Sequence, residues 1–543
     1  MDEATYQTVH ANGCPCREAS DDPRHDQRCE HLGPVLEDVA KILIGGNFPV
    51  VELTKMKGSD GISISVEPYR KSVSYTAITH VWADGLGNPR SNTLPRCQCS
   101  RLYELLSHLS DRMEGLSLAR NALSRFSKRA TVYVWIDTLC IPHVKELRKQ
   151  AINLMYSVYQ KATKVLLLDE SLLQVSSSRP LEELCFRITI SPWMRRAWTL
   201  QEGALANTLF IQLADGPIHV QSAIDSLARR AKGTESYNIT LMESCIILQY
   251  LESCRLGVDE SQVTIVHSGL IDRSTSHEED KKLCLAIMLG CNMQRIQEAK
   301  GEERTKRIYE QMQYIPDSFF WHRHACLSIQ GFSWAPKNIW HAHANGSMAR
   351  NRLQMRNGRL QVKAPSVVYR SRSHYVSKQA HHIRDVKSEK WYTLMLHENE
   401  PFEQIASQSR AEWTTLAVIL KAGVLASSQC EGIVISLDWA QDTDSLSKSL
   451  ETINSPKQEV KGSFVGRALF VELDQKATAK LASMKATHKD IEQMRADIRS
   501  GKQSIEDMEE VRGPTLRRML LEDDDSWWVF DGVVLNETSW SIR

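Results

Sequence analysis

The stretch RRAWTLQEG, residues 195–203, contains the densest mixture of side chains that could do acid–base or ionic chemistry. Two arginines, a tryptophan, a glutamine and Glu202 occur within these nine positions, and a helix that only packs does not need them all. Glu202 is a candidate catalytic acid. The alternatives are an anchor that holds backbone N–H groups or pairs with Arg195 or Arg196, and a solvated residue at a helix end.

Four more side chains form a candidate binding set. Arg196 could hold a phosphate or carboxylate through two hydrogen bonds, although a salt bridge is the commoner role of one arginine. Asp137 ends an apolar segment, where a carboxylate could contact ribose hydroxyls or cap the following turn. Trp82 could stack on a base or a nicotinamide ring, but a core tryptophan is the commoner case. Trp198 completes the set and could help to bury Glu202 and shift its pKa.

The N-terminal residues Cys14, Cys16, Cys29 and His31 follow the pattern C-x-C-x12-C-x-H. Thiolates and an imidazole suit tetrahedral zinc, and a polar segment with little core would gain stability from a metal. Structural zinc sites usually contain C-x2-C rather than C-x-C, so a tail with incidental thiols is the competing interpretation. The CQC motif at 97–99 has no second pair of ligands beside it, and we assign it a structural role.

A basic stretch lies in the second half of the chain. From Lys337 to Arg384 there are ten Lys or Arg residues and no acidic residue. Such a stretch could bind anions or nucleic acid, but aromatic residues are sparse within it. A solvated loop, or a surface that pairs with the acidic residues 522–525, explains it better. We therefore do not expect a nucleic-acid partner.

The elements that must position these side chains alternate between strand and helix. Three apolar, partly β-branched segments are typical of buried strands: 75–82, 131–137 and 164–168. Apolar positions recur at helical spacing in the segments between them, over 100–127 and 146–162. This order predicts right-handed crossovers and a parallel sheet. Such a sheet binds ligands at the carboxyl ends of its strands, where Trp82 and Asp137 stand.

The chain of 543 residues is too long for one core, and we divide it into four parts. They are a lead-in over 1–70 with the candidate zinc knuckle, an α/β domain over 71–215, a mostly helical region over 216–330 and a mixed α+β region over 331–543. Within the last part, residues 474–512 are rich in Lys, Glu, Asp, Met and Ala, which predicts an exposed helical insertion.

Composition narrows the functional class. A hydrophobic content of 42% and a net charge of +1 describe a globular protein without a global field that would attract nucleic acid or membranes. No apolar run reaches the ~18 residues of a membrane-spanning helix. The N-terminus lacks the basic flank and apolar core of a secretory signal, and thirteen scattered cysteines are typical of reduced thiols. We expect a cytoplasmic protein.

Five blocks of the sequence resemble the fungal heterokaryon-incompatibility (HET) domain in order and spacing. They are YTAITHVWADGLGNP (75–89), LPRCQCSRL (94–102), YVWIDTLCIP (133–142), INLMYSVYQKATKVLLLD (152–169) and RRAWTLQEG. The resemblance implies a fungal protein of self/non-self recognition and regulated cell death. It departs from many family members at Pro142-His143, where they have Asn or Asp followed by Gln.

The resemblance also implies a fold similar to the TIR domain, with a flavodoxin-like parallel sheet. Many TIR domains cleave NAD at the nicotinamide–ribose bond with a glutamate in a Trp-Cys-x-x-Glu segment. WTLQE (198–202) looks like that segment with Thr199 in place of Cys, which makes Glu202 the candidate catalytic residue. Two hypotheses follow: an NAD-cleaving effector that acts when oligomerised, and a non-catalytic signalling module of the same fold that acts through self-assembly or protein partners.

Overall fold

The computed structural model describes residues 8–11, 14, 29–55, 61–114, 131–231, 251, 254, 262–322, 324–341, 352–372, 380–396, 413–421, 429–437, 460–483, 493, 497, 500 and 529–542. The chain forms two compact units, Met1–Arg304 and Thr305–Arg543. None of the described helices is long and apolar enough to cross a membrane.

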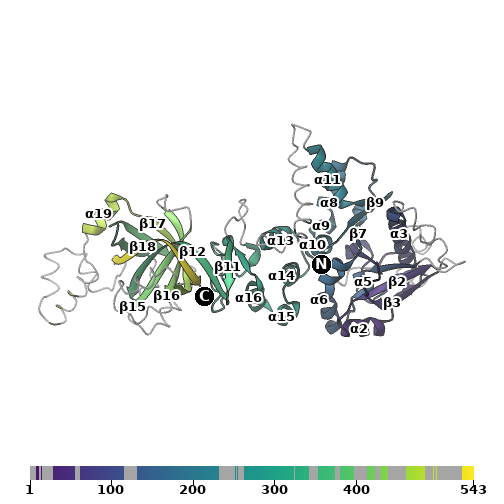
Figure 1. Cartoon of the computed structure of the whole chain (residues 1–543), viewed down its shortest axis with the longest axis horizontal. Coiled ribbons are helices and arrows are strands. Elements are labelled where there is room, and N and C mark those ends of the chain that lie inside the picture. The colour runs from purple at the N-terminus through teal and green to yellow at the C-terminus, as the bar shows by residue number, and fades with distance from the viewer. Residues whose placement is uncertain are drawn as a thin grey trace, which may run out of the picture. The chain divides into compact units, whose positions relative to one another are not determined.

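The first unit is built on a seven-stranded sheet with the order β3-β2-β6-β4-β7-β8-β9 (Figure 1). In chain order the strands are β2 (Pro49–Lys55), β3 (Ile62–Pro68), β4 (Thr76–His80), β6 (Thr131–Trp135), β7 (Lys164–Leu168), β8 (Leu209–Leu213) and β9 (Gly216–His219). The strands predicted from the apolar segments are therefore present. Strands β2 and β3 precede them in the chain and belong to the same sheet.

The sheet is mixed, which corrects the expectation of a parallel sheet. Its centre, β6-β4-β7-β8, is parallel, whereas β2, β3 and β9 are antiparallel to their neighbours. The reason at the β8–β9 end is the connection length. Only two residues separate these strands, and a two-residue turn can join antiparallel strands but not parallel ones.

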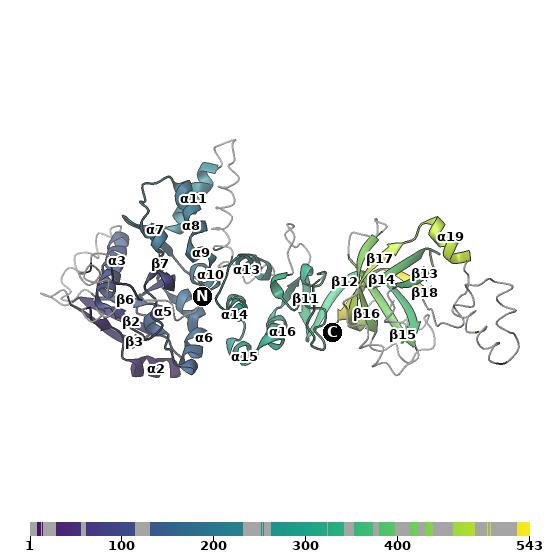
Figure 2. The same cartoon turned by 180° about the vertical axis from the view of Figure 1, so that it is seen from behind.

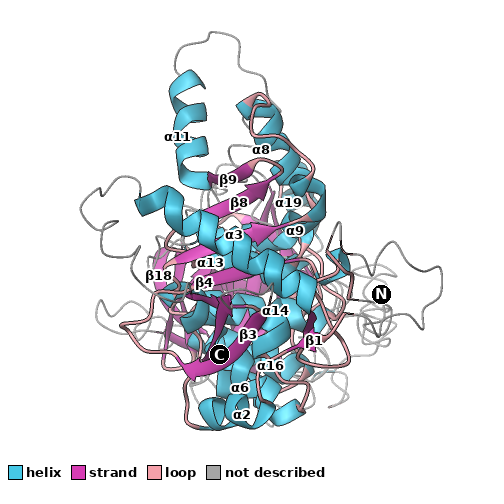
Figure 3. Cartoon of the chain, turned by 90° about the vertical axis from the view of Figure 1, so that its right-hand side faces the viewer, coloured by secondary structure: helices cyan, strands magenta, loops and turns pink. Residues whose placement is uncertain are grey.

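Helices accompany the sheet, and two of them, α3 (Arg96–Glu114) and α6 (Lys145–Lys161), lie where the periodicity predicted helices. The others are α2 (Leu36–Ile44), α8 (Leu181–Ile190) and α10 (Ala197–Ala204). Helix α6 buries Ala151, Met155 and Val158 at helical spacing, and Ala151 packs with Val39 and Leu43 of α2. Figure 3 shows α8 and α11 (Val220–Ala231) beside strands β8 and β9.

More helices follow the sheet in the first unit. They are α13 (Gln262–Ile271), α14 (Glu278–Met288), α15 (Met293–Glu298) and α16 (Gly301–Gln311), the last of which crosses the boundary between the units. Helix α14 packs against α10 and is almost wholly buried from Leu283 to Met288. This contact covers the helix that carries Glu202.

The second unit contains a nine-stranded sheet with the order β10-β11-β12-β15-β16-β17-β14-β13-β18 (Figure 2). Its strands are β10 (Tyr314–Pro316), β11 (Arg352–Arg356), β12 (Arg359–Arg372), β13 (Ala380–Asp385), β14 (Trp391–Leu396), β15 (Trp413–Leu420), β16 (Gln429–Leu437), β17 (Val460–Glu472) and β18 (Val529–Ile542). Strand β18 also pairs with β12 and β17. Of the predicted helical insertion at 474–512, the structure describes α19 (Gln475–Ser483), and most of the rest lies outside the described residues.

Candidate functional site

The carboxyl ends of β4 and β6 carry two residues of the predicted binding set. Trp82 begins the 3-10 helix η3 (Trp82–Asp84) after β4, and Asp137 begins the short helix α5 (Asp137–Cys140) after β6. Strand β4 pairs with β6 on one side and with β7 on the other, so the chain runs from β4 to β6 and then crosses to β7 on the opposite side of β4. Open α/β sheets bind ligands at such a switch point, outside the carboxyl ends of the strands.

Asp137 is held as an ionised carboxylate. It accepts hydrogen bonds from Trp82 Nε1 at 2.6 Å and from the backbone N–H of Thr138 at 2.7 Å, and His80 Nε2 lies 2.8 Å from its Oδ1. Burial raises the pKa of Asp137, but the charge of His80 and these hydrogen bonds outweigh it and lower the pKa to about 2. The Asp137 side chain is 26% exposed, so solvent reaches it.

Glu202 is held in the opposite state. Only 8% of the residue is exposed, and its carboxylate accepts a short hydrogen bond from the Thr79 hydroxyl. The buried Tyr159 interacts electrostatically with Glu202, and burial together with this interaction raises the pKa of Tyr159. Burial is the main cause that raises the pKa of Glu202 to about 7, and the charge of Asp137 adds to it, while the Thr79 hydrogen bond opposes it.

The pKa values of the two carboxylates are therefore shifted in opposite directions although the two groups interact electrostatically. His80 and Thr79 are consecutive residues of β4, and each contacts one of the two acids. The His80 ring is buried, and its Nδ1 atom has no hydrogen-bond partner among the described residues.

Arg196 and Trp198 lie at the start of α10 and take different roles. Arg196 Nη1 donates to the backbone oxygen of His80 at 3.3 Å, which ties the helix start to the end of β4. Trp198 Nε1 donates to Asp280 Oδ2 of α14 at 3.2 Å. The Trp198 indole NH is thus engaged with α14, whereas Arg196 contacts the residue that holds Asp137.

Sequence reasoning gave no role to three side chains of this site: Thr79, His80 and Tyr159. Trp193 is fully buried, and its indole donates to Thr79 Oγ1 at 2.6 Å. The available signal was the pair Thr79–His80, which is polar at the end of an otherwise apolar strand. A buried polar side chain needs a partner, and here the partners come from elements distant in the sequence.

The residues predicted to bind zinc are separated. Cys14 and Cys29 lie in one cluster with His10 and Cys97. His31 is outside that cluster, and its Nδ1 lies 3.2 Å from the Thr93 hydroxyl. Cys16 lies outside the described residues.

Residues 75–182 match the family model of the heterokaryon incompatibility protein (HET). The HET domain predicted from the sequence is thus supported over this range, which contains Trp82 and Asp137 and ends before Arg196, Trp198 and Glu202. No curated protein and no solved structure matches the chain. The domain implies a role in heterokaryon incompatibility in fungi, and the likeness to TIR domains stays a prediction.

Proposed function

We propose that this HET domain acts in heterokaryon incompatibility and regulated cell death by cleaving the nicotinamide–ribose bond of NAD in the cytoplasm. One observation carries the proposal: two carboxylates at the carboxyl edge of the central strands have pKa values pushed in opposite directions, to about 2 for Asp137 and about 7 for Glu202. Opposed shifts of this kind are typical of acid–base pairs in enzymes.

The chemistry assigns a role to each acid. The C1′–N bond breaks with its electron pair going to nicotinamide, and positive charge develops on the ribose ring. Three of the contacts of Asp137 are to Oδ1, and Oδ2 accepts from Trp82 Nε1 alone among the described residues, so Oδ2 can accept one more hydrogen bond, from a ribose hydroxyl. The ionised form of Glu202 stabilises the ribose cation and takes a proton from the attacking water, for which a pKa near 7 is suited.

The remaining predicted residues fit a dinucleotide. Trp82 is partly exposed beside Asp137 and offers a ring for stacking on nicotinamide. Arg196 is also partly exposed and could hold a phosphate. Because Glu202 is only 8% exposed, the segments that cover it must move when NAD binds. We therefore place the activity in a self-associated form of the protein, because self-association can favour the conformation in which these segments have moved.

The test is to express the wild type, Glu202→Gln and Glu202→Ala at equal levels and to follow both NAD and growth arrest. We expect NAD loss and arrest with the wild type and neither with the two variants. Glu146→Gln is the matched control, because the Glu146 side chain is exposed on α6 and pairs with Lys149 rather than with a residue of the site. Arrest by the Glu202 variants with NAD unchanged would contradict the catalytic proposal.

A second candidate is a signalling module without catalysis, which acts through self-assembly or a protein partner. The closed hydrogen-bond chain from Trp193 through Thr79 to Glu202 favours it, since a buried acid with all partners inside the fold can serve packing alone. This candidate expects Glu202→Gln to keep growth arrest, because the amide preserves the hydrogen bond from Thr79. It also expects assembly, measured by light scattering, to correlate with arrest across variants.

A further inference from the structure

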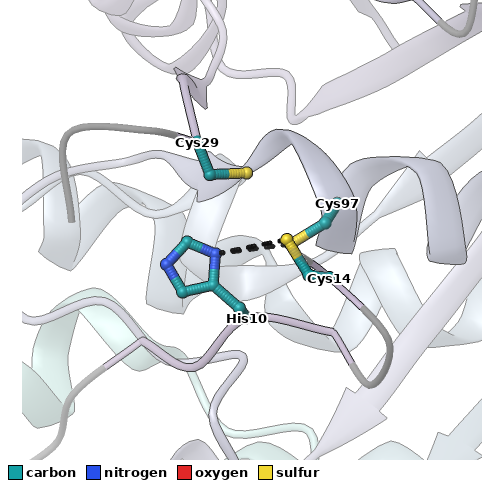
Figure 4. Close-up of side chains that lie close together, drawn as sticks. All are labelled: His10, Cys14, Cys29 and Cys97. Carbon is teal, nitrogen blue, oxygen red and sulfur yellow. Dashed lines mark hydrogen bonds between the residues drawn. The ribbon is translucent and has the colours of Figure 1, made fainter. Parts of the chain in front are cut away.

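Four side chains that can ligate a metal converge at the N-terminal edge of the first unit (Figure 4): His10, Cys14, Cys29 and Cys97. Their ligand atoms all lie within 4.8 Å of one another. His10 Nδ1 is 3.6 Å from Cys97 Sγ and 4.0 Å from Cys14 Sγ. Cys14 is buried, and none of the described cysteines forms a disulfide.

A short ladder places two of the cysteines. Strand β1 (His31–Leu32) pairs with β5 (Leu94–Pro95) in antiparallel register, with His31 opposite Pro95. The ladder continues past β1, because Arg96 N donates to Glu30 O at 2.8 Å. Cys29 directly precedes Glu30 and Cys97 directly follows Arg96, so this pairing brings together two cysteines that lie 68 positions apart (97 − 29) in the chain.

Separate hydrogen bonds hold the N-terminal segment against this ladder. Val9 N donates to Gly85 O at 3.0 Å, and Gln98 Nε2 donates to Val9 O at 2.7 Å. Ala11 N donates to Cys97 Sγ at 3.3 Å, as backbone groups do to metal-bound thiolates. These bonds fix the backbone on both sides of His10.

We propose that His10, Cys14, Cys29 and Cys97 form a structural Zn²⁺ site with three thiolates and one imidazole. Tetrahedral zinc with Zn–S of about 2.3 Å and Zn–N of about 2.0 Å separates its ligand atoms by roughly 3.6–3.8 Å. The two distances from His10 Nδ1, 3.6 and 4.0 Å, fall at this value and slightly above it. A Cys3His set with no carboxylate selects zinc over magnesium or calcium, which prefer oxygen ligands.

The two cysteines of the CQC motif lie in different surroundings. Cys97 lies in the first turn of α3, and its thiol belongs to the cluster with His10, Cys14 and Cys29. Cys99, two residues later, is fully buried, and its Sγ contacts the backbone oxygen of Leu94 at 3.9 Å instead. The CQC motif therefore contains one ligand and one core cysteine.

The site has a consequence for the candidate functional site. The N-terminal segment packs on Gly85, where a Cβ atom would lie 2.7 Å from Val9 Cβ. Thr8 Oγ1 also donates to Gly87 O at 2.9 Å, and Gly87 lies directly against the Trp82 side chain. Zinc bound at this site would therefore hold the N-terminal segment in place against the loop that follows Trp82. This role does not depend on the proposed NAD chemistry.

Metal analysis of the full chain, purified with reductant and dialysed against metal-free buffer, tests the proposal. We expect about one zinc per chain in the wild type and in Cys99→Ala, and less than a tenth of that in Cys97→Ala. Cys99→Ala is the matched control, because it changes the same helical turn without removing a ligand. Loss of zinc in both variants, or no stoichiometric zinc in the wild type after reconstitution with zinc chloride, would overturn the site.

A second measurement separates ligand loss from unfolding. His10→Gln alters a ligand in the N-terminal segment alone, and its circular dichroism should match the wild type. We expect Co²⁺-loaded wild type to show the intense thiolate charge-transfer and tetrahedral ligand-field absorption, and His10→Gln to bind Co²⁺ at least tenfold more weakly. Equal Co²⁺ affinity in the two proteins, or a mass-mapped disulfide between Cys29 and Cys97 in protein isolated under argon, would contradict the proposal.

Discussion

The indole of Trp193 donates a 2.6 Å hydrogen bond to the hydroxyl of Thr79, inside the first unit. The Thr79 hydroxyl in turn donates to the Glu202 carboxylate, so the three side chains form one buried chain. Trp193 comes from α9 (Pro192–Arg195), Thr79 from the central strand β4 and Glu202 from α10. This chain fixes the position of an acid that burial keeps protonated up to neutral pH.

Replacing Glu202 by Gln should remove a pH-dependent loss of stability. Because the folded pKa of about 7 exceeds the unfolded value, the folded state keeps its proton longer, and stability falls as the pH rises from about 4.5 to 7. We expect Glu202→Gln to match the wild type near pH 4.5 and to exceed it above pH 7 by on the order of 3 kcal/mol. Urea unfolding at several pH values measures the difference.

The control for that measurement is Glu146→Gln, whose side chain is 73% exposed and should leave the pH profile unchanged. A Glu202→Gln protein that is less stable than the wild type at pH 8 would show that the ionised carboxylate stabilises the fold.

Asp137 should show the opposite pH dependence. Its folded pKa of about 2 lies below the unfolded value, so it contributes stability above pH 4 that is lost as the pH falls toward 2. Asp137→Asn should therefore cost about 2 kcal/mol at pH 7 and nothing near pH 2. Thermal unfolding across this range tests it, and a cost that stays constant with pH would assign the effect to lost hydrogen-bond geometry instead.

Gly203 should not tolerate a methyl group. In a helix, Gly→Ala normally gains up to about 1 kcal/mol. Here a Cβ atom would lie 2.8 Å from Cη2 of the fully buried Trp193, which is held by its bond to Thr79. Overpacking costs roughly 1–3 kcal/mol and should outweigh the gain.

Gly269→Ala is the comparison for Gly203→Ala, because its Cβ would meet the Leu200 Cδ2 methyl at 3.3 Å. A flexible leucine can yield by the few tenths of an ångström required, so we expect a change within about 0.5 kcal/mol. If both substitutions stabilise the protein in urea, the Trp193 ring is less constrained than its contacts indicate.

In the second unit, the buried His322 should make the fold less stable in acid. It is buried, and burial together with the charge of Arg467 lowers its pKa to about 3. Arg467 also donates to the backbone oxygen of Trp334 at 2.9 Å, so the cation is fixed in place. Because the folded pKa is below the unfolded one, stability is complete above pH 6.5 and falls as the pH drops toward 3.

Replacing His322 by Gln should remove this pH dependence, so that the loss of stability at pH 4 is smaller than in the wild type by several kcal/mol. Hydrogen exchange of peptides from β12 and β17, in the full chain, reports the stability of the second unit. His277→Gln is the control, because His277 is an exposed histidine of the first unit. If His322→Gln and the wild type lose equal stability in acid, other groups cause that loss.

The sequence alone determined the local elements of the first unit. Its apolar segments and helical periodicity predicted β4, β6, β7 and α6, because short-range patterning reflects which faces become buried. The same strands placed Trp82 and Asp137 at one edge, since carboxyl ends of parallel strands meet there. The antiparallel edges escaped prediction, because strand direction depends on connections and partners rather than on the pattern within a strand.

Only the tertiary structure decided which side chains meet. Glu202 and Asp137 were both visible in the sequence, but their opposite pKa shifts depend on burial, on His80 and on Thr79 from another element. The proposed metal ligands give the plainest case. The sequence favoured His31 and assigned Cys97 a structural role, whereas the pairing of β1 with β5 brings Cys97 close to Cys29. Spacing along the chain predicts ligands that are close in sequence, and a ligand from 68 residues away (97 − 29) depends on the tertiary pairing of β1 with β5.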